Sequence, residues 1–261
     1  MTDTTTPSPA IVLSVTDGIA RVTLNRPSRL NAIDQESAER WRDAAHEIAR
    51  RDDVVAVIFD AAGSAFCAGG DIHAMSGNGS YDGAAIAALA DVIHEGHRVF
   101  REMPKPIVAA VQGAVAGGGL GFMLVADYIV ASDSAFFASR YSAIGLTPDC
   151  GVSTLLPEAV GMRRALELTL SSRRLSAAEA LDWGLVTEVV APEELASRVD
   201  AVALSWRSGA AGAFGQAKRL MRASTQRSYQ ENLDDEARTI GASIETPDAT
   251  RLIAAFTAPR S

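Results

Sequence analysis

The sequence predicts an α/β protein in which buried strands alternate with helices, followed by a helical C-terminal region. A strand, a loop and a helix recur in turn at Val54, Ile107 and Tyr128. The strands are continuous apolar runs of the kind that parallel sheets bury on both faces. From Ser153 onward the pattern is almost wholly helical. We therefore expect one domain of stacked β and α units with a helical appendage.

The chain divides into three predicted parts: a disordered tail (1–10), an α/β domain (11–197) and a helical region (198–261). The opening letters MTDTTTPSPA lack the basic stretch and the following apolar stretch of a signal peptide. This composition favours a disordered tail over a targeting segment.

Composition and charge exclude several classes of function. Hydrophobic residues make up 48% of the 261 residues and charged residues 21%, which is typical of a globular protein with a sizeable core. The net charge of -8 argues against a nucleic-acid partner, because a phosphate backbone requires a basic surface. Two cysteines, Cys67 and Cys150, cannot form a disulfide framework, so we expect a cytoplasmic protein.

The predicted elements follow one another in a regular order. The run IVLSVTDGIARVTLN alternates apolar and polar residues on both sides of Asp17 and Gly18, which predicts a β-hairpin. Asp34 is expected to cap a helix that runs to about Arg51. The run VVAVIFDAA predicts a buried strand, and a second helix ends near EMPKP. The run IVAAV predicts the next strand, ending at Val111.

Residues 106–126 carry no charge, so a membrane span has to be weighed against a buried strand and helix. The run contains Gly117, Gly118, Gly119 and Gly121, and units buried on both faces are uncharged for the same reason as a membrane helix. We therefore predict a buried strand, a glycine turn and a helix that starts near Gly118, with no membrane association.

The C-terminal third is predicted to be helical. The run RRLSAAEALDWGLVTEVV indicates a capped helix before a short strand, and the segment from Arg198 to Pro259 indicates three more helices. Because these helices are rich in Ala and apolar residues, we expect them to pack on the body or on another subunit.

The glycine turn at the start of the helix near Gly118 can serve chemistry or packing. A nucleotide loop is excluded, because GGGLGF does not satisfy the G-x-G-x-x-G pattern and no Lys-Ser/Thr pair follows. A helix start presents free backbone N–H groups, which is an oxyanion hole in outline. The alternative to an oxyanion hole is that the glycines only allow the helix to pack closely against the sheet. Another glycine turn, AFCAGGDI, lies earlier in the chain and also follows a buried strand, and two converging turns would give two donors to one oxygen.

Four motifs together resemble the crotonase, or enoyl-CoA hydratase/isomerase, superfamily. They are LNRPSRLNAI, AFCAGGDIHAM, KPIVAAVQGAVAGGGLGF and GLTPDCGVSTLLPEAVGMRRALEL, and the similarity runs from about residue 11 to 225. The resemblance implies a crotonase-like spiral of ββα units, with residues 198–261 as a helical trimerisation region. It also implies a homotrimer or a dimer of trimers, and an acyl-CoA thioester as substrate. Coenzyme A is then part of the substrate, and no separate cofactor is expected.

The same resemblance assigns the binding residues. The backbone N–H groups of Ala68 and Gly118 are predicted to hold the thioester carbonyl as it becomes an enolate. Predicted coenzyme A contacts are Arg29, Ala68, Gly69, Asp71 and Ile72. A solvated side chain is the alternative for Arg29, and Asp71 is also interpreted as a residue that fixes its loop.

The sequence departs from the hydratase pattern at the catalytic positions. Hydratases of the superfamily carry two glutamates that align with Gly121 and Tyr141, so hydration loses its acid/base pair here. The motif GLTPDCG supplies Asp149 instead, which the isomerase branches use as a proton shuttle. The alternative for Asp149 is a simple helix N-cap after Pro148.

A dehalogenase of the 4-chlorobenzoyl-CoA type is the alternative reaction. The resemblance to that branch makes Asp149 a nucleophile, His94 the base that activates water and Tyr141 the aromatic partner, where the branch has Trp. A hydratase that relies on Asp149 and a non-catalytic CoA-thioester-binding protein remain as further alternatives.

Other candidate side chains are given plainer interpretations. His94 and His97 are spaced three apart in HEGH, not four as in zinc proteases, so no metal site is predicted. His97 is expected on a solvated helix face. Cys67 and Cys150 are interpreted as small buried hydrophobes, with a nucleophile as the alternative.

Overall fold

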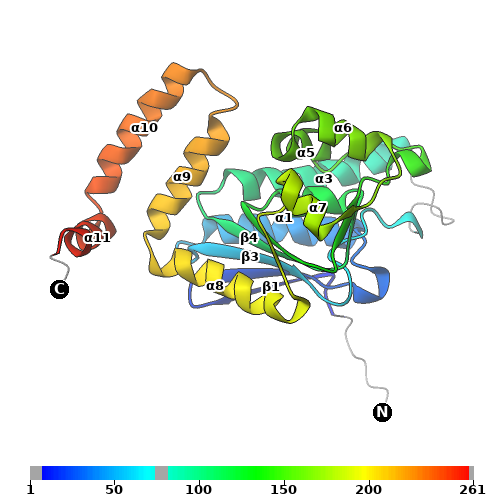
Figure 1. The fold of residues 1–261 in the computed structure, drawn as a ribbon, viewed down its shortest axis with the longest axis horizontal. Coiled ribbons are helices and arrows are strands. Elements are labelled where there is room, and N and C mark those ends of the chain that lie inside the picture. Colours follow the sequence, from blue (N-terminus) through cyan, green and yellow to red (C-terminus); the bar gives the residue numbers. More distant parts are fainter. Residues whose placement is uncertain (1–7, 74–81, 259–261) are drawn as a thin grey trace, which may run out of the picture.

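The computed structural model describes residues 8–73 and 82–258, and Figure 1 shows a sheet-containing body from which the last helices extend to one side. The strands are β1 (Ile11–Thr16), β2 (Ile19–Leu24), β3 (Ala56–Ala61), β4 (Ile107–Val111), β5 (Ala114–Ala116), β6 (Tyr128–Ser132), β7 (Phe136–Ala138), β8 (Leu175–Ser176) and β9 (Glu188–Val190). The helices are α1 (Gln35–Arg50), α3 (Gly83–Glu102), α4 (Gly119–Leu124), α5 (Val152–Val160), α6 (Met162–Leu170), α7 (Ala177–Trp183), α8 (Leu195–Ser208), α9 (Ala211–Ala223), α10 (Tyr229–Ile244) and α11 (Pro247–Thr257). Short 3-10 turns lie at Pro27–Arg29, Ser142–Ile144 and Pro192–Glu194.

The strands form two sheets. Six strands lie in the order β1-β2-β3-β4-β6-β9, and a smaller sheet has the order β5-β7-β8. The predicted hairpin is confirmed, with β1 antiparallel to β2 and Asp17 and Gly18 both at positive φ in the turn. Each later pair in the large sheet is parallel. Helices therefore carry the chain between its strands, as the recurring pattern predicts.

Both faces of the central strands β3, β4 and β6 are buried, because alternate residues of these strands enter different cores. Val57 and Phe59 of β3 face the main core, which includes Trp41 of α1 and Phe100 of α3. Ile58, between them, packs with apolar side chains of α8. Burial on both faces explains why these strands are uninterrupted apolar runs. Among the described residues no helix is long and apolar enough to cross a membrane.

The predicted helix starts are largely confirmed. The Asp34 side chain accepts a hydrogen bond from the Ser37 amide and caps α1. Strand β4 ends at Val111, and α4 starts at Gly119 with Gly118 at its N-cap position. A Cβ on Gly119 would lie 2.3 Å from the Cys67 carbonyl oxygen, so only glycine lets the two turns approach this closely.

The C-terminal region contains one more helix than the sequence suggested. Four helices, α8 to α11, cover the described residues from 195 to 257, where three were predicted after Arg198. Thr246 caps α11 and Pro247 is its first residue, and this pair separates α10 from α11. In Figure 1, α9 to α11 lie beside the body, whereas α8 packs on the sheet.

The outer helices expose large apolar side chains. Ile240 of α10 is 70% exposed and Phe256 of α11 is 88% exposed. Side chains of this size are costly to leave in water.

Candidate active site

A pocket of about 410 Å³ opens where the two glycine turns meet. One wall holds the turns themselves, a second holds apolar side chains of α3, and a third holds the segment that leads into α5. Lining residues include Gly70, Gly118, Ile93, Tyr141 and Asp149. Most of the described lining residues are apolar or glycine, and the charged ones among them are Asp149 and Arg140.

The first of the two glycine turns in chain order, AFCAGGDI (residues 65–72), is hydrogen-bonded to two other segments. The Ile33 amide donates to the Gly69 carbonyl at 2.8 Å, and the Asp71 amide donates to the Ile33 carbonyl at 2.9 Å. The Cys67 amide donates to the Ala114 carbonyl of β5 at 3.1 Å. Gly69 has a φ of +93°, and a Cβ there would lie 2.8 Å from the Ala116 carbonyl oxygen. Glycine at this position lets the first turn lie directly against the second.

The structure corrects one of the two predicted oxyanion donors. The Ala68 N–H donates to the Leu30 carbonyl at 3.0 Å, so it is not available to a ligand. Within the described ranges, the amides of Gly70 and Gly118 donate to no protein acceptor. The pair that can hold an oxygen is therefore Gly70 and Gly118.

The structure places the other residues predicted to bind coenzyme A in different surroundings. Ile72 is 47% exposed and lines the pocket, while Arg29 is exposed at the end of the turn Pro27–Arg29. Asp71 is buried, and its carboxylate pairs with Arg26 Nη2 at 3.0 Å. This ion pair agrees with the interpretation of Asp71 as a residue that fixes its loop.

Arg26 was not singled out from the sequence, although it holds several segments together. Its guanidinium pairs with Asp34 Oδ2 at 2.9 Å as well as with Asp71, and it donates to the Ala32 carbonyl. One side chain thereby joins the start of α1 to the first glycine turn. The NRP motif gave no sign of this, because the three acceptors are 6, 8 and 45 residues away.

Asp149 and Tyr141 meet at the second glycine turn. The Tyr141 hydroxyl donates to Asp149 Oδ1 at 2.5 Å. A Cβ built on Gly118 would lie 3.6 Å from Asp149 Oδ1 and 3.6 Å from the Tyr141 hydroxyl. The carboxylate is therefore close to one of the two free amides, within reach of an atom that the amides would hold.

Tyr141 remains a hydroxyl donor. Its side chain is buried, and burial raises the pKa of the phenol well above its usual value, with Cys150 and Asp149 adding to the effect. A protonated phenol stabilises the charged carboxylate of Asp149 and fixes its orientation.

The interpretation of Asp149 as a helix N-cap is wrong. Helix α5 begins at Val152, and the residue at its N-cap position is Gly151. Cys150 and Gly151 have φ values of 50° and 75°, so two successive residues in the left-handed region turn the chain sharply after Asp149. Such backbone is uncommon for a non-glycine residue, and it holds the carboxylate toward the pocket.

Gly121 lies directly beneath this turn. A Cβ at Gly121 would lie 2.0 Å from the Cys150 carbonyl oxygen and 2.8 Å from the Cys150 Cβ. The turn that carries Asp149 therefore fills the place of any side chain at position 121. The site presents a carboxylate from the turn and excludes one from α4.

Neither cysteine is activated as a nucleophile. Cys67 is buried, and burial raises the pKa of its thiol to about 12. Burial also raises the pKa of Cys150, and the neighbouring charge of Asp149 adds to the effect. Both side chains are thiols at neutral pH, in accord with the interpretation as small buried hydrophobes.

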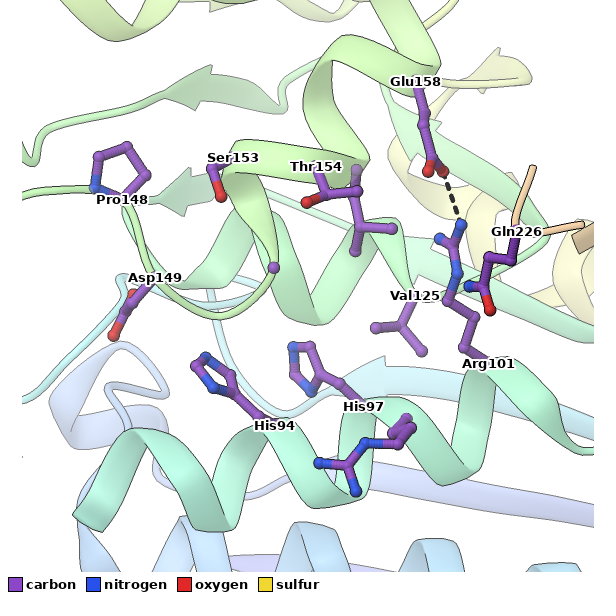
Figure 2. Close-up of a pocket in the computed structure, with 13 residues that line it drawn as sticks. His94, His97, Arg101, Val125, Pro148, Asp149, Ser153, Thr154, Glu158 and Gln226 are labelled. Atoms are coloured by element: carbon purple, nitrogen blue, oxygen red, sulfur yellow. Dashed lines mark hydrogen bonds and ion pairs between the residues drawn. The ribbon is translucent and has the colours of Figure 1, made fainter. Parts of the chain in front are cut away.

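His94 and His97 lie on α3 and line a second cavity of about 400 Å³, which also borders Asp149. Figure 2 shows both rings pointing from α3 toward the segment that carries Asp149. The prediction of a solvated face for His97 is wrong: it is 7% exposed, and its Nδ1 accepts a hydrogen bond from Trp41 Nε1 at 2.9 Å. The HEGH pattern concealed this, because the partner lies 56 residues earlier in the chain.

Across the described residues, no group of three or more His, Cys, Asp and Glu side chains could hold a metal ion.

Comparisons with known proteins agree with this fold. The family model described as enoyl-CoA hydratase/isomerase matches residues 14–260. A 1,2-epoxyphenylacetyl-CoA isomerase of Escherichia coli is 30% identical over 96% of this chain and 96% of its own length. The 4-chlorobenzoyl coenzyme A dehalogenase-2 of an Arthrobacter species is 30% identical over 92% of this chain and 88% of its own length. The crystal structure of an enoyl-CoA hydratase from Bacillus anthracis matches with a TM-score of 0.89 and 27% identity, covering 95% of each chain.

Proposed function

We propose that this chain, which belongs to the enoyl-CoA hydratase/isomerase family, moves a double bond within an acyl-coenzyme A thioester. The relatives differ in their named reactions at similar identity, so the choice between reactions rests on the geometry of the site.

The proposed reaction begins when the thioester carbonyl oxygen accepts hydrogen bonds from the Gly70 and Gly118 amides. The Asp149 carboxylate removes a proton from the carbon next to the carbonyl, and the electron pair of that C–H bond forms a dienolate. Each amide donor stabilises the developing oxyanion, typically by about 3 kcal/mol. Asp149 then returns a proton to a carbon further along the chain, which leaves the double bond in its new position.

One observation carries the choice of isomerase over hydratase: the turn holding Asp149 occupies the space of a side chain at position 121. Hydratases of the family need a glutamate there, and a Cβ alone would meet the Cys150 carbonyl at 2.0 Å. The second glutamate position holds Tyr141, which donates to Asp149 instead of activating water. A single carboxylate that both removes and returns a proton suits an isomerase, whereas hydration needs water held and activated as well.

The coenzyme A contacts and the trimer interface are also part of this proposal. The main chain of the first turn, with Ile72 and Arg29 nearby, is the proposed contact for the coenzyme A part of the substrate, and the apolar wall of the pocket receives the acyl chain. Helices α9 to α11 form the proposed trimer interface, since they carry the exposed apolar side chains described above.

Dehalogenation of a halogenated aroyl-CoA is the second candidate, favoured by the position of His94. Asp149 would attack the ring carbon that bears the halide, and the carbon–halogen bond would break as the halide ion leaves. His94 would then activate the water that hydrolyses the resulting aryl ester of Asp149. The second cavity brings both residues to one space. A single turnover in ¹⁸O-labelled water distinguishes the reactions, because only dehalogenation places the label in the Asp149 carboxylate.

The central experiment measures isomerisation of 3-hexenoyl-CoA and exchange of its α-hydrogens with deuterated water. We expect wild-type protein to catalyse both and Asp149→Asn to lose on the order of 100-fold or more of each, since a positioned general base contributes about that much. Asp43→Asn is a matched control, because Asp43 is 63% exposed and pairs with Arg42 at the surface. Tight binding of the thioester with neither isomerisation nor exchange would show a binding protein in place of an isomerase.

A further inference from the structure

Asp149 lies between two cavities, and only one of them is the proposed acyl pocket. The second cavity, of about 400 Å³, lies between α3, the start of α5 and the end of α9. Its lining residues include His94, His97, Arg101, Ser153, Thr154 and Asp149. Unlike the acyl pocket, it is bordered mainly by side chains that form hydrogen bonds.

Three buried polar atoms along α3 have no hydrogen-bond partner. They are His94 Nε2, His97 Nε2 and Arg101 Nη1. The three residues are spaced three and four apart, so they lie along one face of the helix, and all three border the cavity. Figure 2 shows the two rings and Arg101 along the same side of the cavity. Buried polar groups of this kind are normally satisfied by protein or by ordered water.

The hydrogen-bonding role of His97 is fixed by its neighbour. Trp41 Nε1 can only donate, so His97 Nδ1 accepts and Nε2 carries the proton. Burial lowers the pKa of His97 to about 3, and the nearby His94 adds to this, so the ring is neutral. His97 and Arg101 therefore offer N–H donors, which an oxygen atom would satisfy.

The charges around the cavity favour water over an anion. Arg101 Nη2 pairs with Glu158 Oε2 at 2.7 Å, and Asp149 borders the opposite end. Arg98 is exposed at the rim. Two carboxylates and two guanidinium groups give the cavity no net charge. Its volume holds several waters, and exposed Ser153 and Thr154 place its mouth in contact with solvent.

We propose that this cavity, which we call the rear cavity, is a water site through which Asp149 exchanges its proton with solvent while substrate covers the acyl pocket. The inference rests on the proposed isomerase function. His94 is a positioning residue: its Nε2 holds the water nearest to Asp149. The protonated carboxyl gives its proton to that water and receives another from it, so no net charge moves.

The consequence is that the hydrogen returned to the product comes from solvent. Without the rear cavity, the proton that Asp149 takes from the α-carbon stays on Asp149 and is delivered to the γ-carbon of the same molecule. With it, the proton is exchanged between the two steps. The isotope at the γ-carbon therefore reports how fast Asp149 exchanges its proton through the rear cavity relative to how fast it delivers that proton to the γ-carbon.

The test is isomerisation of protiated 3-hexenoyl-CoA in deuterated water, with deuterium at the γ-carbon measured by NMR during the first turnovers. We expect wild-type product to carry solvent deuterium. In His94→Leu we expect exchange per isomerisation to fall about tenfold or more, because a positioned group contributes on the order of 100-fold or more to proton transfer. His46→Gln is the matched control, since His46 pairs with Glu95 at the surface and lies outside the rear cavity.

The outcomes distinguish failure of the proton path from failure of the proposed isomerase function. Wild-type product without deuterium, or equal labelling by wild type and His94→Leu, overturns the proton path while leaving the isomerase intact. Absence of isomerisation by wild type overturns the proposed function and this inference with it. If His94→Leu fails to fold, Thr154→Leu at the exposed mouth repeats the test, and labelling there equal to wild type also counts against the path.

Discussion

Replacing Gly121 by alanine tests whether the turn beneath Asp149 sets the activity. The new Cβ would lie 2.0 Å from the Cys150 carbonyl oxygen, whereas carbon and oxygen atoms normally approach to about 3.3 Å. The turn therefore has to move by about 1.3 Å. Because a misplacement of about 1 Å at a reacting group costs about 100-fold in rate, we expect kcat on 3-hexenoyl-CoA to fall by about that factor.

The expected change in kcat corresponds to about 2.7 kcal/mol in the activation free energy. We expect the free energy of unfolding to fall by about 1–3 kcal/mol, the usual cost of overpacking. KM should change little, since the Gly70 and Gly118 amides remain in place. The assay is steady-state isomerisation with unfolding in urea measured in parallel.

Gly241→Ala is the control, because a Cβ at that exposed position in α10 meets nothing within 4 Å. It should leave kcat unchanged and stabilise the helix slightly, by about 0.5–1 kcal/mol. A folded Gly121→Ala variant with wild-type kcat would show that the position of Asp149 is not set by this contact.

Three further predictions follow from individual contacts. Tyr141→Phe removes the hydroxyl that donates a hydrogen bond to Asp149. Because a hydrogen bond to a charged group contributes about 1.5–3 kcal/mol, we expect kcat to fall about 10- to 100-fold in the same assay. An unchanged kcat would exclude this orienting role of Tyr141. Unfolded chains protonate His97 below its ordinary pKa of 6.5, whereas the folded protein does so only below about 3, so stability should decline as pH falls from 6.5 toward 3. His97→Gln should weaken that decline in urea titrations at successive pH values, and an equal decline in both proteins would contradict the assignment. Ile240→Glu places a charge on an exposed apolar face of α10, and light scattering should show a trimer for wild type and a smaller species for the variant; a wild-type monomer would end the trimer proposal.

Local signals made much of the fold predictable from the sequence. Asp17 and Gly18 gave the hairpin, and Asp34 gave the start of α1, because turns and caps are formed by neighbouring residues. The apolar runs gave the strands, since a strand buried on both faces excludes charge. The short strands β5, β7 and β8 were not recognised, because two or three residues carry no periodicity.

The details of the site depended on contacts between distant residues. Motif position alone suggested the Ala68 amide as an oxyanion donor. Because that amide donates to the Leu30 carbonyl, the free donor in this turn is the Gly70 amide. The HEGH pattern indicates a surface position for His97, because it does not show the hydrogen bond that Trp41 donates to this ring. A pattern within one segment cannot show which of its polar groups another segment satisfies.

The contact between Gly121 and the Cys150 carbonyl also limits how this protein can change over evolutionary time. If Gly121 is first replaced by glutamate, the new side chain clashes with the turn that carries Asp149 and cannot contribute a second carboxylate. If the turn is first moved away by another mutation, Asp149 is lost from the pocket. Either order passes through an impaired intermediate, so the two substitutions are epistatic. Conversion to a water-adding enzyme therefore requires coordinated change in two segments about thirty residues apart.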